Sequence, residues 1–447
     1  MVPTATLLLA LAALALQAPG GTWTQARLEA ATREILPQVE ALRGAQFLRP
    51  VKVEVASTAG LRAYVEQREA ALTTPARRHR DECVAKLLGL VPPAADLRAL
   101  ELEIVEGQVG GFYDPAADAF FLMDAMTGGG VQIILAHELT HALDDQHYEL
   151  DALLAAANED TDAELAIRCV IEGSGTNLMN RWTLAHGGSI PPGELAALQG
   201  MGAEALRKAP PVLWKPLVAA YFAGDAFLAR TKGLNLMAKA AKPEDVERAF
   251  RDPPRTMEQV LHPDRYWDPA RREQPDAVCF DVGSIPEGWA ELAQDTLGEF
   301  ALALLVTPPA ERKGLDPTNS FALLSMKWTN EAAKGWGGDR LILLGRGDER
   351  LVQLVTTWDT ARDADEFAAA LAGAAPQLFA GPREAQSGFV PRFSPTWFEV
   401  ERGEADGLPF VLVRAGCAAQ DEPLAAVRLR WIATRPSAAA DSAEDGR

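Results

Sequence analysis

Three long segments in the first half of the chain carry apolar residues at intervals of three and four, which is the period of an α-helix. We therefore expect helices over residues 24–42, 131–147 and 162–184. Shorter segments alternate apolar with polar residues or are rich in aromatic side chains, and both patterns favour strands. The expected strands are residues 51–55, 112–113 and 119–123.

A second pattern begins after residues 268–275, a segment rich in proline and charge that we interpret as a linker. Beyond it, strand signals and helix signals occur together. The expected hairpins are 340–344 with 351–357 and 397–401 with 409–413, and the expected helices are 292–305 and 363–371. This mixture predicts an α+β domain.

At about 100–200 residues per domain, a chain of 447 residues has room for two or three domains. The patterns predict an α+β protein, with a mostly helical first domain that holds a small sheet and a smaller second domain. The expected segments are a signal peptide at 1–20, a first domain at 21–267, a linker at 268–275, an α+β domain at 276–435 and a disordered tail at 436–447.

The chain carries a formal net charge of −19, from 62 acidic and 43 basic residues. A strongly acidic protein repels phosphate backbones and anionic lipid, so nucleic acid is not expected as a partner. The acidic residues are spread along the chain, and we interpret most of them as solvated surface positions.

Residues 5–16 form an apolar run that has the length of a signal-peptide core and is too short to span a bilayer as a helix. Small residues at 18–20 suit cleavage near Gly21. We therefore expect a secreted or periplasmic protein without stable membrane insertion, and no later segment looks long and apolar enough to span a membrane. The alternative for the run is a buried N-terminal helix.

The four cysteines are Cys83, Cys169, Cys279 and Cys417. Disulfides persist in the compartments to which exported proteins go. Separate folding of the two domains favours Cys83–Cys169 and Cys279–Cys417, one of three possible pairings. Four buried free thiols are the alternative.

The most informative motif is HELTH at residues 137–141, within the expected helix 131–147. Two histidines four residues apart point to the same side of a helix, so both imidazoles can bind one zinc ion. Glu138 lies about 100° around the helix from His137, beside the metal. A general base at that place can take a proton from an activated water. Two buried histidines without a metal are the alternative.

A catalytic zinc site needs a third protein ligand, and Glu172 is our first choice. This carboxylate follows the apolar residues 169–171, and burying it is costly unless it is paired or binds a metal. Its alternative partner is Arg168, one turn earlier. Glu164, on the same expected helix, is a weaker choice for the ligand.

His147 is the alternative third ligand, because it lies ten residues after His137, as in the pattern HExxHxxGxxH. That pattern reverses the chain at a glycine, where this sequence has Asp144. If the helix continues, His147 lies about 120° and about 9 Å away from His141 and cannot reach the same ion. No glycine or proline interrupts this stretch, which favours Glu172.

With HELTH followed by a helix that bears Glu-Gly, the chain resembles the gluzincins, the thermolysin-like clan of zinc peptidases. It is more closely similar to a family of exported bacterial proteins assigned as metallopeptidases and largely uncharacterised. The matching segments are GGFYDP at 110–115, HELTHALDDQ at 137–146, IEG at 171–173, PPRTMEQVLHPDRY at 253–266 and GWGGDR at 335–340.

The resemblance implies a zincin-like catalytic domain that binds Zn²⁺ through His137, His141 and Glu172. It implies no particular substrate. One departure concerns Thr176, because thermolysin-like enzymes often have an aspartate four residues after the glutamate, where it orients a ligand histidine. The support of the histidines is therefore expected to differ here.

His and Tyr side chains stabilise the oxyanion in related peptidases, which makes His262 and Tyr266 candidates for this role. Tyr113 has a similar but weaker claim. For His262 and Tyr266 the alternative is a structural role, in which they tie their helix to the rest of the domain.

The expected function is hydrolysis of a peptide or protein substrate, with Glu138 as general base. Residues 119–123 could pair with an extended substrate. Two other functions remain open: a non-catalytic binding or scaffold protein stabilised by zinc, and a zinc hydrolase that acts on a non-peptide amide. An intact Glu138 argues against the scaffold, because a structural zinc has no use for a base.

Overall fold

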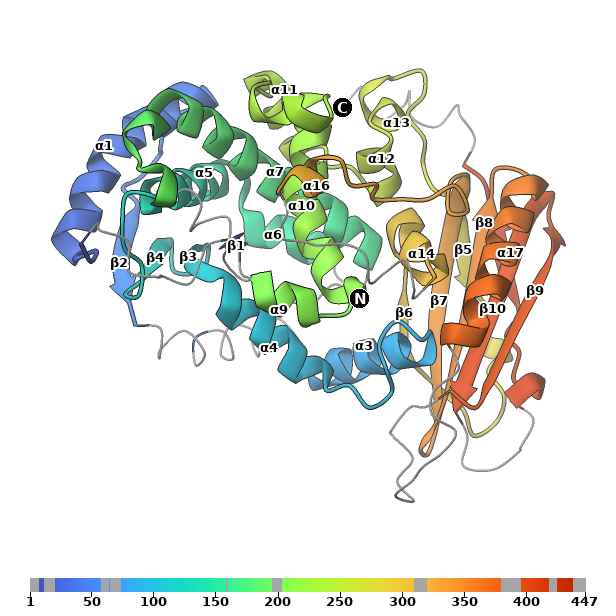
Figure 1. Cartoon of the computed structure of the whole chain (residues 1–447). Coiled ribbons are helices and arrows are strands. Elements are labelled where there is room, and N and C mark those ends of the chain that lie inside the picture. Colours follow the sequence, from blue (N-terminus) through green and yellow to red (C-terminus); the bar gives the residue numbers. More distant parts are fainter. Residues whose placement is uncertain are drawn as a thin grey trace.

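The computed structural model describes residues 8–11, 21–57, 64, 74–157, 160–194, 203–308, 320–378, 395–417 and 424–436. The fold is α+β, as expected, with helices dominating the first part and strands the last part. Figure 1 shows most of the helices gathered on one side and a five-stranded sheet on the other. Most of the expected signal peptide and the expected tail lie outside the described residues.

The first part of the chain is mostly helical. Its α-helices are α1 (Gln25–Arg43), α3 (Pro75–Leu87), α4 (Leu97–Gln108), α5 (Val131–Tyr148), α6 (Leu150–Ala156), α7 (Thr161–His186), α9 (Ala203–Lys208), α10 (Pro211–Ala229), α11 (Pro243–Arg251), α12 (Met257–Leu261) and α13 (Asp264–Trp267). Two 3-10 helices are η1 (Gly187–Ser189) and η2 (Gly233–Met237). The three expected helices correspond to α1, α5 and α7. Their apolar residues, which predicted the helices, are the residues through which the three helices pack against one another.

A small sheet lies beside α5 and has the strand order β1-β3-β4-β2. The expected strands at 112–113 and 119–123 lie in β3 (Val109–Asp114) and β4 (Ala119–Met123), which pair antiparallel, and β2 (Lys52–Ala56) runs parallel to β4. Strand β1 (Leu8–Leu11) pairs with the other edge of β3. The expectation that residues 119–123 bind an extended substrate is wrong, because β4 is hydrogen-bonded along both edges.

Helices α7 and α10 cross with their backbones in contact. A Cβ atom on Gly224 would lie 2.0 Å from the carbonyl oxygen of Cys169, and one on Gly173 would lie 2.4 Å from the carbonyl carbon of Gly224. Only glycine permits such an approach. Gly173 directly follows Glu172, so this crossing determines where the Glu172 side chain lies.

We expect Gly224→Ala to destabilise the fold by about 3 kcal/mol or more, because the new methyl group meets backbone that cannot move aside. Gly373→Ala in α17 (Ala361–Leu378) is the matched control. Its Cβ meets nothing within 4 Å, and alanine is the better helix former, so stability should rise by about 0.5–1 kcal/mol. Urea unfolding of both variants measures the difference, and equal stabilities would contradict the crossing.

Helix α10 is long and apolar enough to cross a membrane, contrary to the expectation that no segment after the leader is. However, 83% of its apolar window is buried inside the molecule. It packs against α7 in the centre of the helical part (Figure 1), which is the environment of a core helix.

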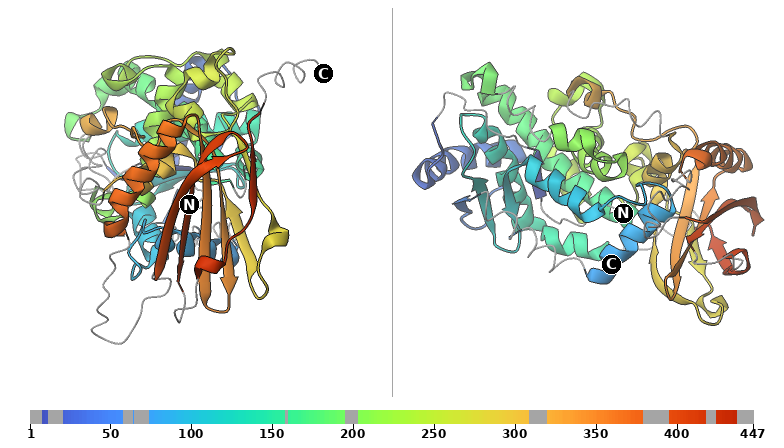
Figure 2. Two further views of the ribbon diagram at one scale, coloured as in Figure 1. Left: turned by 90° about the vertical axis from the view of Figure 1, so that its right-hand side faces the viewer. Right: turned by 60° about the horizontal axis from the view of Figure 1, so that its bottom comes forward.

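The second part of the chain is built around a five-stranded sheet with the order β6-β7-β8-β10-β9 (Figure 2). Its strands are β6 (Ala290–Asp295), β7 (Trp336–Arg346), β8 (Glu349–Trp358), β9 (Trp397–Ala405) and β10 (Leu408–Cys417). A smaller sheet pairs β5 (Ala277–Phe280) with β11 (Trp431–Thr434). The remaining elements are α14 (Gly298–Val306), α16 (Ser320–Leu324), α17 (Ala361–Leu378), η3 (Val282–Ser284) and η4 (Leu424–Ala426).

Alternating side chains cover both faces of the five-stranded sheet. Leu341 and Leu343 point to a core that includes Phe367 of α17. Ile342 and Leu344 point to a second core, which the five-stranded sheet shares with the two-stranded sheet of β5 and β11. The first of these cores also contains residues of α3 and α10, so it is continuous with the helical part. The division into two domains therefore stays a prediction.

The expected helix 292–305 is wrong in its first half. Residues 290–295 form β6 and pair with β7, and α14 begins only at Gly298, which has a φ of +72°. The backbone hydrogen bonds that residues 290–295 form with the edge of β7 outweigh the helical preference of their local pattern.

The expected disulfides are also wrong, since all four cysteines are free thiols in the structure. Cys83 and Cys169 are buried. The Sγ atom of Cys169 lies 3.6 Å from the Sδ atom of Met257 and not next to another cysteine.

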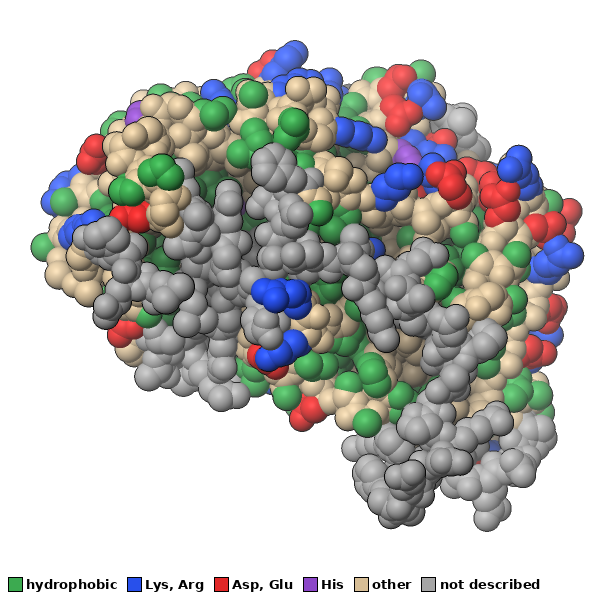
Figure 3. Space-filling model, in the orientation of Figure 1, with side chains coloured by type: hydrophobic (Ala, Val, Ile, Leu, Met, Phe, Trp, Pro, Cys, Tyr) green, Lys and Arg blue, Asp and Glu red, His purple; other side chains and the backbone are tan. Residues whose placement is uncertain are grey.

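Charged side chains lie on the surface of the molecule. On the face in Figure 3, acidic and basic side chains are interspersed, in agreement with the interpretation of most acidic residues as solvated positions.

Candidate metal centre

The HELTH segment lies in the middle of α5, whose apolar residues pack on the small sheet and on α7. Helical geometry places the side chains of His137 and His141 one above the other. Both are buried, with exposed fractions of 1% and 0%. Their Nε2 atoms are 2.8 Å apart, and their rings meet edge to face. The two imidazoles thus converge on a single point.

Glu172 reaches the same point from α7. Its Oε2 atom lies 3.2 Å from Nε2 of His137 and 3.4 Å from Nε2 of His141. Burial raises the pKa of the Glu172 carboxyl, but the neighbouring His141 and His137 outweigh it and lower the pKa to about 2. Arg168, the alternative partner, is bound to Glu164 instead. Glu164 also pairs with Arg77, so it is committed to a structural ion pair.

The electrostatics of the two histidines differ. Burial and the neighbouring His141 lower the pKa of His137. Burial also disfavours the charged form of His141, yet Glu172, Glu138 and Asp144 raise its pKa overall. Asp144 is balanced by its ion pair with Arg43, so the carboxylates of Glu172 and Glu138 are the negative groups beside the two imidazoles, and such a field favours a bound cation.

The residues fit a zinc ion. The two Nε2 atoms and one carboxylate oxygen form the His₂Glu donor set of catalytic zinc sites. The possible ligand atoms of His137, Glu138 and His141 all lie within 4.8 Å of one another. Without an ion, both Nε2 atoms would have to share one small space with a carboxylate. The donor set therefore suits a metal that keeps a position open for substrate.

The hydrogen bonding of the two histidines differs from the thermolysin-like pattern, because position 176 is a threonine and not an aspartate. The Nδ1 atoms of His137 and His141 have no hydrogen-bond partner among the described residues, and neither has Oγ1 of Thr176. A carboxylate at position 176 would be the usual acceptor for one of these imidazoles. Close packing takes over part of this role, because a Cβ on Gly175 would lie 2.7 Å from Cε1 of His137.

Glu138 is completely buried beside the two histidines. The backbone N–H of Tyr113, in β3, donates a hydrogen bond of 2.7 Å to its Oε2 atom. This bond orients the carboxylate. The phenol of Tyr113 points elsewhere and donates to Asp145 at 2.8 Å. Tyr113 therefore contributes its backbone to the site, and its weak claim as an oxyanion donor is not supported.

His147 lies away from the centre. Helix α5 continues through Tyr148, as the absence of glycine and proline indicates. The exposed His147 side chain is 2.9 Å from the carbonyl oxygen of Gln46 through its Nε2 atom. The chain reversal that His147 would need to approach the metal therefore does not occur.

His262 and Tyr266 also lie away from the centre. Nε2 of His262 is 3.0 Å from the buried carboxylate of Glu299. Tyr266 donates its hydroxyl to the carbonyl oxygen of Asp252 at 2.7 Å, and its ring packs against Phe227. These contacts are structural, in agreement with the alternative considered for both residues.

The sequence analysis missed Tyr221. This residue of α10 is buried, and its ring stacks on His137 with centroids 5.7 Å apart. Burial and the nearby carboxylates of Glu172 and Glu138 raise the pKa of the Tyr221 phenol, so this phenol lies beside the candidate ligand Glu172. The available signal was a single phenol in a largely apolar helical run, which belongs to no motif.

A second residue outside the predicted set is Asp144, three positions after His141. It accepts hydrogen bonds from Arg43 at 2.8 Å and from Ser174 at 2.6 Å. Asp144 thereby links α5 to both α1 and α7. The position that breaks the HExxHxxGxxH pattern thus holds the helices around the centre together.

Comparison with known protein families matches residues 287–416 to a "Domain of unknown function (DUF8575)". This range covers the five-stranded sheet except Cys417, the last residue of β10, together with α14, α16 and α17, and it excludes α5 and α7. No curated protein and no solved structure matches the chain.

Proposed function

We propose that this protein is an exported, zinc-dependent peptidase of gluzincin type. The observation that carries the proposal is the convergence of His137, His141 and Glu172 from two helices, with Glu138 buried beside them. Metal-assisted hydrolysis requires ligands that hold the metal and a separate general base. The three converging side chains supply the ligands, and the carboxylate of Glu138 supplies the base.

Bound Zn²⁺ would polarise the scissile carbonyl and make a water molecule more acidic. Glu138, oriented by the N–H of Tyr113, would take the proton of that water and deliver it to the leaving amine. Tyr221 lies beside Glu172 and covers one side of His137 with its ring. The low dielectric of this buried site strengthens each of these electrostatic effects.

The edge of β3 is our proposed binding strand for an extended substrate. Tyr113, whose N–H holds Glu138, pairs with Leu8 of β1 in the antiparallel register. Strand β1 belongs to the expected signal peptide. Removal of residues 1–20 on export would free this edge next to the general base, and a substrate backbone could then take the same hydrogen bonds.

The test is digestion of casein and of a peptide library by the purified protein, with and without a chelator. We expect cleavage that the chelator abolishes and that added zinc restores. A scaffold protein would bind zinc through a closed set of four ligands and cleave nothing. Cleavage of small amides without cleavage of peptides would identify a non-peptide amidase instead.

A further inference from the structure

Two cysteines lie on the same side of the five-stranded sheet, one in α3 and one in the sheet itself. Helix α3 lies against β8 and β10 (Figure 1). Val411, Val413 and Ala415 of β10 point into a core that also contains residues of α3. Because side chains alternate along a strand, Cys417 points to the same face as Ala415, and it packs against this core. Cys83 of α3 is completely buried in the same core.

Arg350 lies between these two cysteines. It is directly opposite Cys417 in the antiparallel pairing of β8 with β10, and side chains so paired lie on one face with Cβ atoms about 4.5–5.5 Å apart. The Nη2 atom of Arg350 lies 3.4 Å from Nε2 of His79. His79 and Cys83 are one turn apart on α3, so their side chains lie on the same side of that helix. The Arg350 side chain therefore extends from the position beside Cys417 to the side of α3 that bears Cys83.

The ionisation of Cys83 agrees with this arrangement. Burial raises the pKa of the Cys83 thiol to about 12. The guanidinium of Arg350 opposes this rise in pKa, whereas the nearby Cys417 adds to it. Burial also raises the pKa of Cys417, and Arg350 again opposes the rise. Both thiols thus lie near one guanidinium, and Cys417 is close enough to affect the charge of Cys83.

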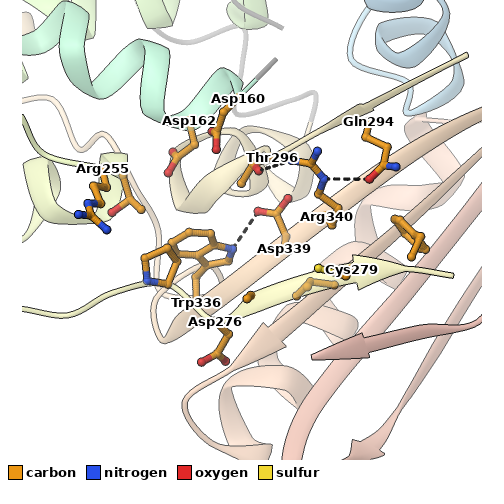
Figure 4. Close-up of a pocket in the computed structure, with 15 residues that line it drawn as sticks. Asp160, Asp162, Arg255, Asp276, Cys279, Gln294, Thr296, Trp336, Asp339 and Arg340 are labelled. Atoms are coloured by element: carbon orange, nitrogen blue, oxygen red, sulfur yellow. Dashed lines mark hydrogen bonds between the residues drawn. The ribbon is translucent and has the colours of Figure 1, made fainter. Parts of the chain in front are cut away.

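The other two cysteines lie elsewhere. Cys169 is buried between α7 and α10, where its sulfur faces Met257. Cys279 belongs to β5, which packs on the opposite face of the five-stranded sheet. Figure 4 shows Cys279 beside a cavity, and no other cysteine is among the described residues that line this cavity. The tertiary structure therefore brings Cys83 together with Cys417, which is neither of the two pairs expected from the sequence.

We propose that Cys83 and Cys417 form a disulfide bond when the protein folds in an oxidising compartment. The oxidant is a small-molecule disulfide such as oxidised glutathione. The Cys417 thiolate attacks one sulfur of the oxidant, which forms a mixed disulfide and releases one thiol. The Cys83 thiolate then attacks the Cys417 sulfur and releases the second thiol. Two protons pass from the cysteines to the released thiols, and the oxidant takes up two electrons.

The order of the two attacks follows from exposure. Cys417 is half-buried at the end of β10, so a soluble oxidant can reach it, whereas Cys83 is completely buried. Only a thiolate attacks a disulfide, and a thiol with a pKa of about 12 is almost never ionised. The bond therefore forms during folding, before α3 packs on the sheet and burial raises this pKa. The structure, in which both thiols are free, is the reduced form.

The bond links the sheet to the helices of the candidate metal centre. Arg77 of α3 pairs with Glu164 of α7 at 2.8 Å, so α3 is attached to the helix that carries Glu172. A disulfide from Cys83 adds a covalent link from α3 to β10. The loop that it closes contains all the candidate ligands, and a crosslink that closes a long loop restricts the unfolded chain most strongly. The proposal rests on export, and it is independent of peptidase activity.

The test is peptide mapping without reductant of the protein made in a bacterial host with an oxidising cytoplasm. We expect one crosslink within the chain, between the peptides that contain Cys83 and Cys417, and alkylation of Cys169 and Cys279. Cys417→Ser should lose the crosslink, and the matched control Cys279→Ser, at an exposed position, should keep it. Reduction should lower the Tm of the wild type by about 5 °C and leave the Tm of Cys417→Ser unchanged.

Alkylation of all four thiols in the protein from the oxidising host would overturn the proposal. A crosslink of Cys417 to Cys279, or one between two chains, would overturn it as well. Cys417→Ser keeps the test decisive, because it changes a half-buried residue at the end of a strand, whereas Cys83→Ser would place a hydroxyl in the core. The readout is a covalent bond, so its absence is distinguishable from a failure of the proposed peptidase activity.

Discussion

Replacement of Glu138 by glutamine is expected to leave the metal bound and to lower kcat/KM for peptide cleavage by about 10²- to 10⁴-fold. Glutamine has nearly the shape of glutamate, and its side-chain oxygen can still accept the hydrogen bond from the N–H of Tyr113. The amide of glutamine, however, is not basic enough to take a proton from water. Metal content by mass spectrometry and steady-state kinetics on the same preparation measure the two effects separately.

The matched control is Glu149→Gln, which makes the same chemical change at an exposed position just after α5. Its activity should equal that of the wild type. Equal activity in Glu138→Gln would remove Glu138 as the general base. Loss of the metal in Glu138→Gln would instead indicate that this carboxylate is itself a ligand.

Replacement of Glu172 by alanine is expected to weaken zinc binding by more than about 100-fold. This loss is larger than the loss of about 10- to 100-fold that follows when a residue hydrogen-bonded to a metal ligand is replaced. The variant removes the carboxylate oxygen that lies 3.2 Å from Nε2 of His137 and 3.4 Å from Nε2 of His141. His147→Ala should retain its metal, because His147 is exposed at the end of α5. Zinc content after dialysis against a chelator measures both variants.

Glu172→Gln complements the alanine variant, because it preserves the packing against Tyr221 while it removes the negative charge. We expect its zinc affinity to lie between those of wild type and Glu172→Ala. Full zinc content in Glu172→Ala together with loss in His147→Ala would refute the His₂Glu assignment. That result would favour a metzincin-like arrangement of the ligands.

The local features of the site could be predicted from the sequence. The side chains of His137 and His141 meet because they are four residues apart on a helix, and backbone hydrogen bonds within the helix determine that spacing. The continuous helix also kept His147 away, since no glycine or proline reverses the chain before it. The apolar residues around Glu172 indicated that its carboxylate would be buried and in need of a partner.

The sequence by itself therefore determined the two histidines, the adjacent Glu138 and the burial of Glu172, because each depends on a helix that the local pattern specifies. Only the tertiary structure decided that the backbone of Tyr113 and the ring of Tyr221 complete the centre, and that His262 does not. These contacts join segments far apart in the chain. They arise from the packing of α5, α7, α10 and β3, and no spacing within one segment encodes that packing.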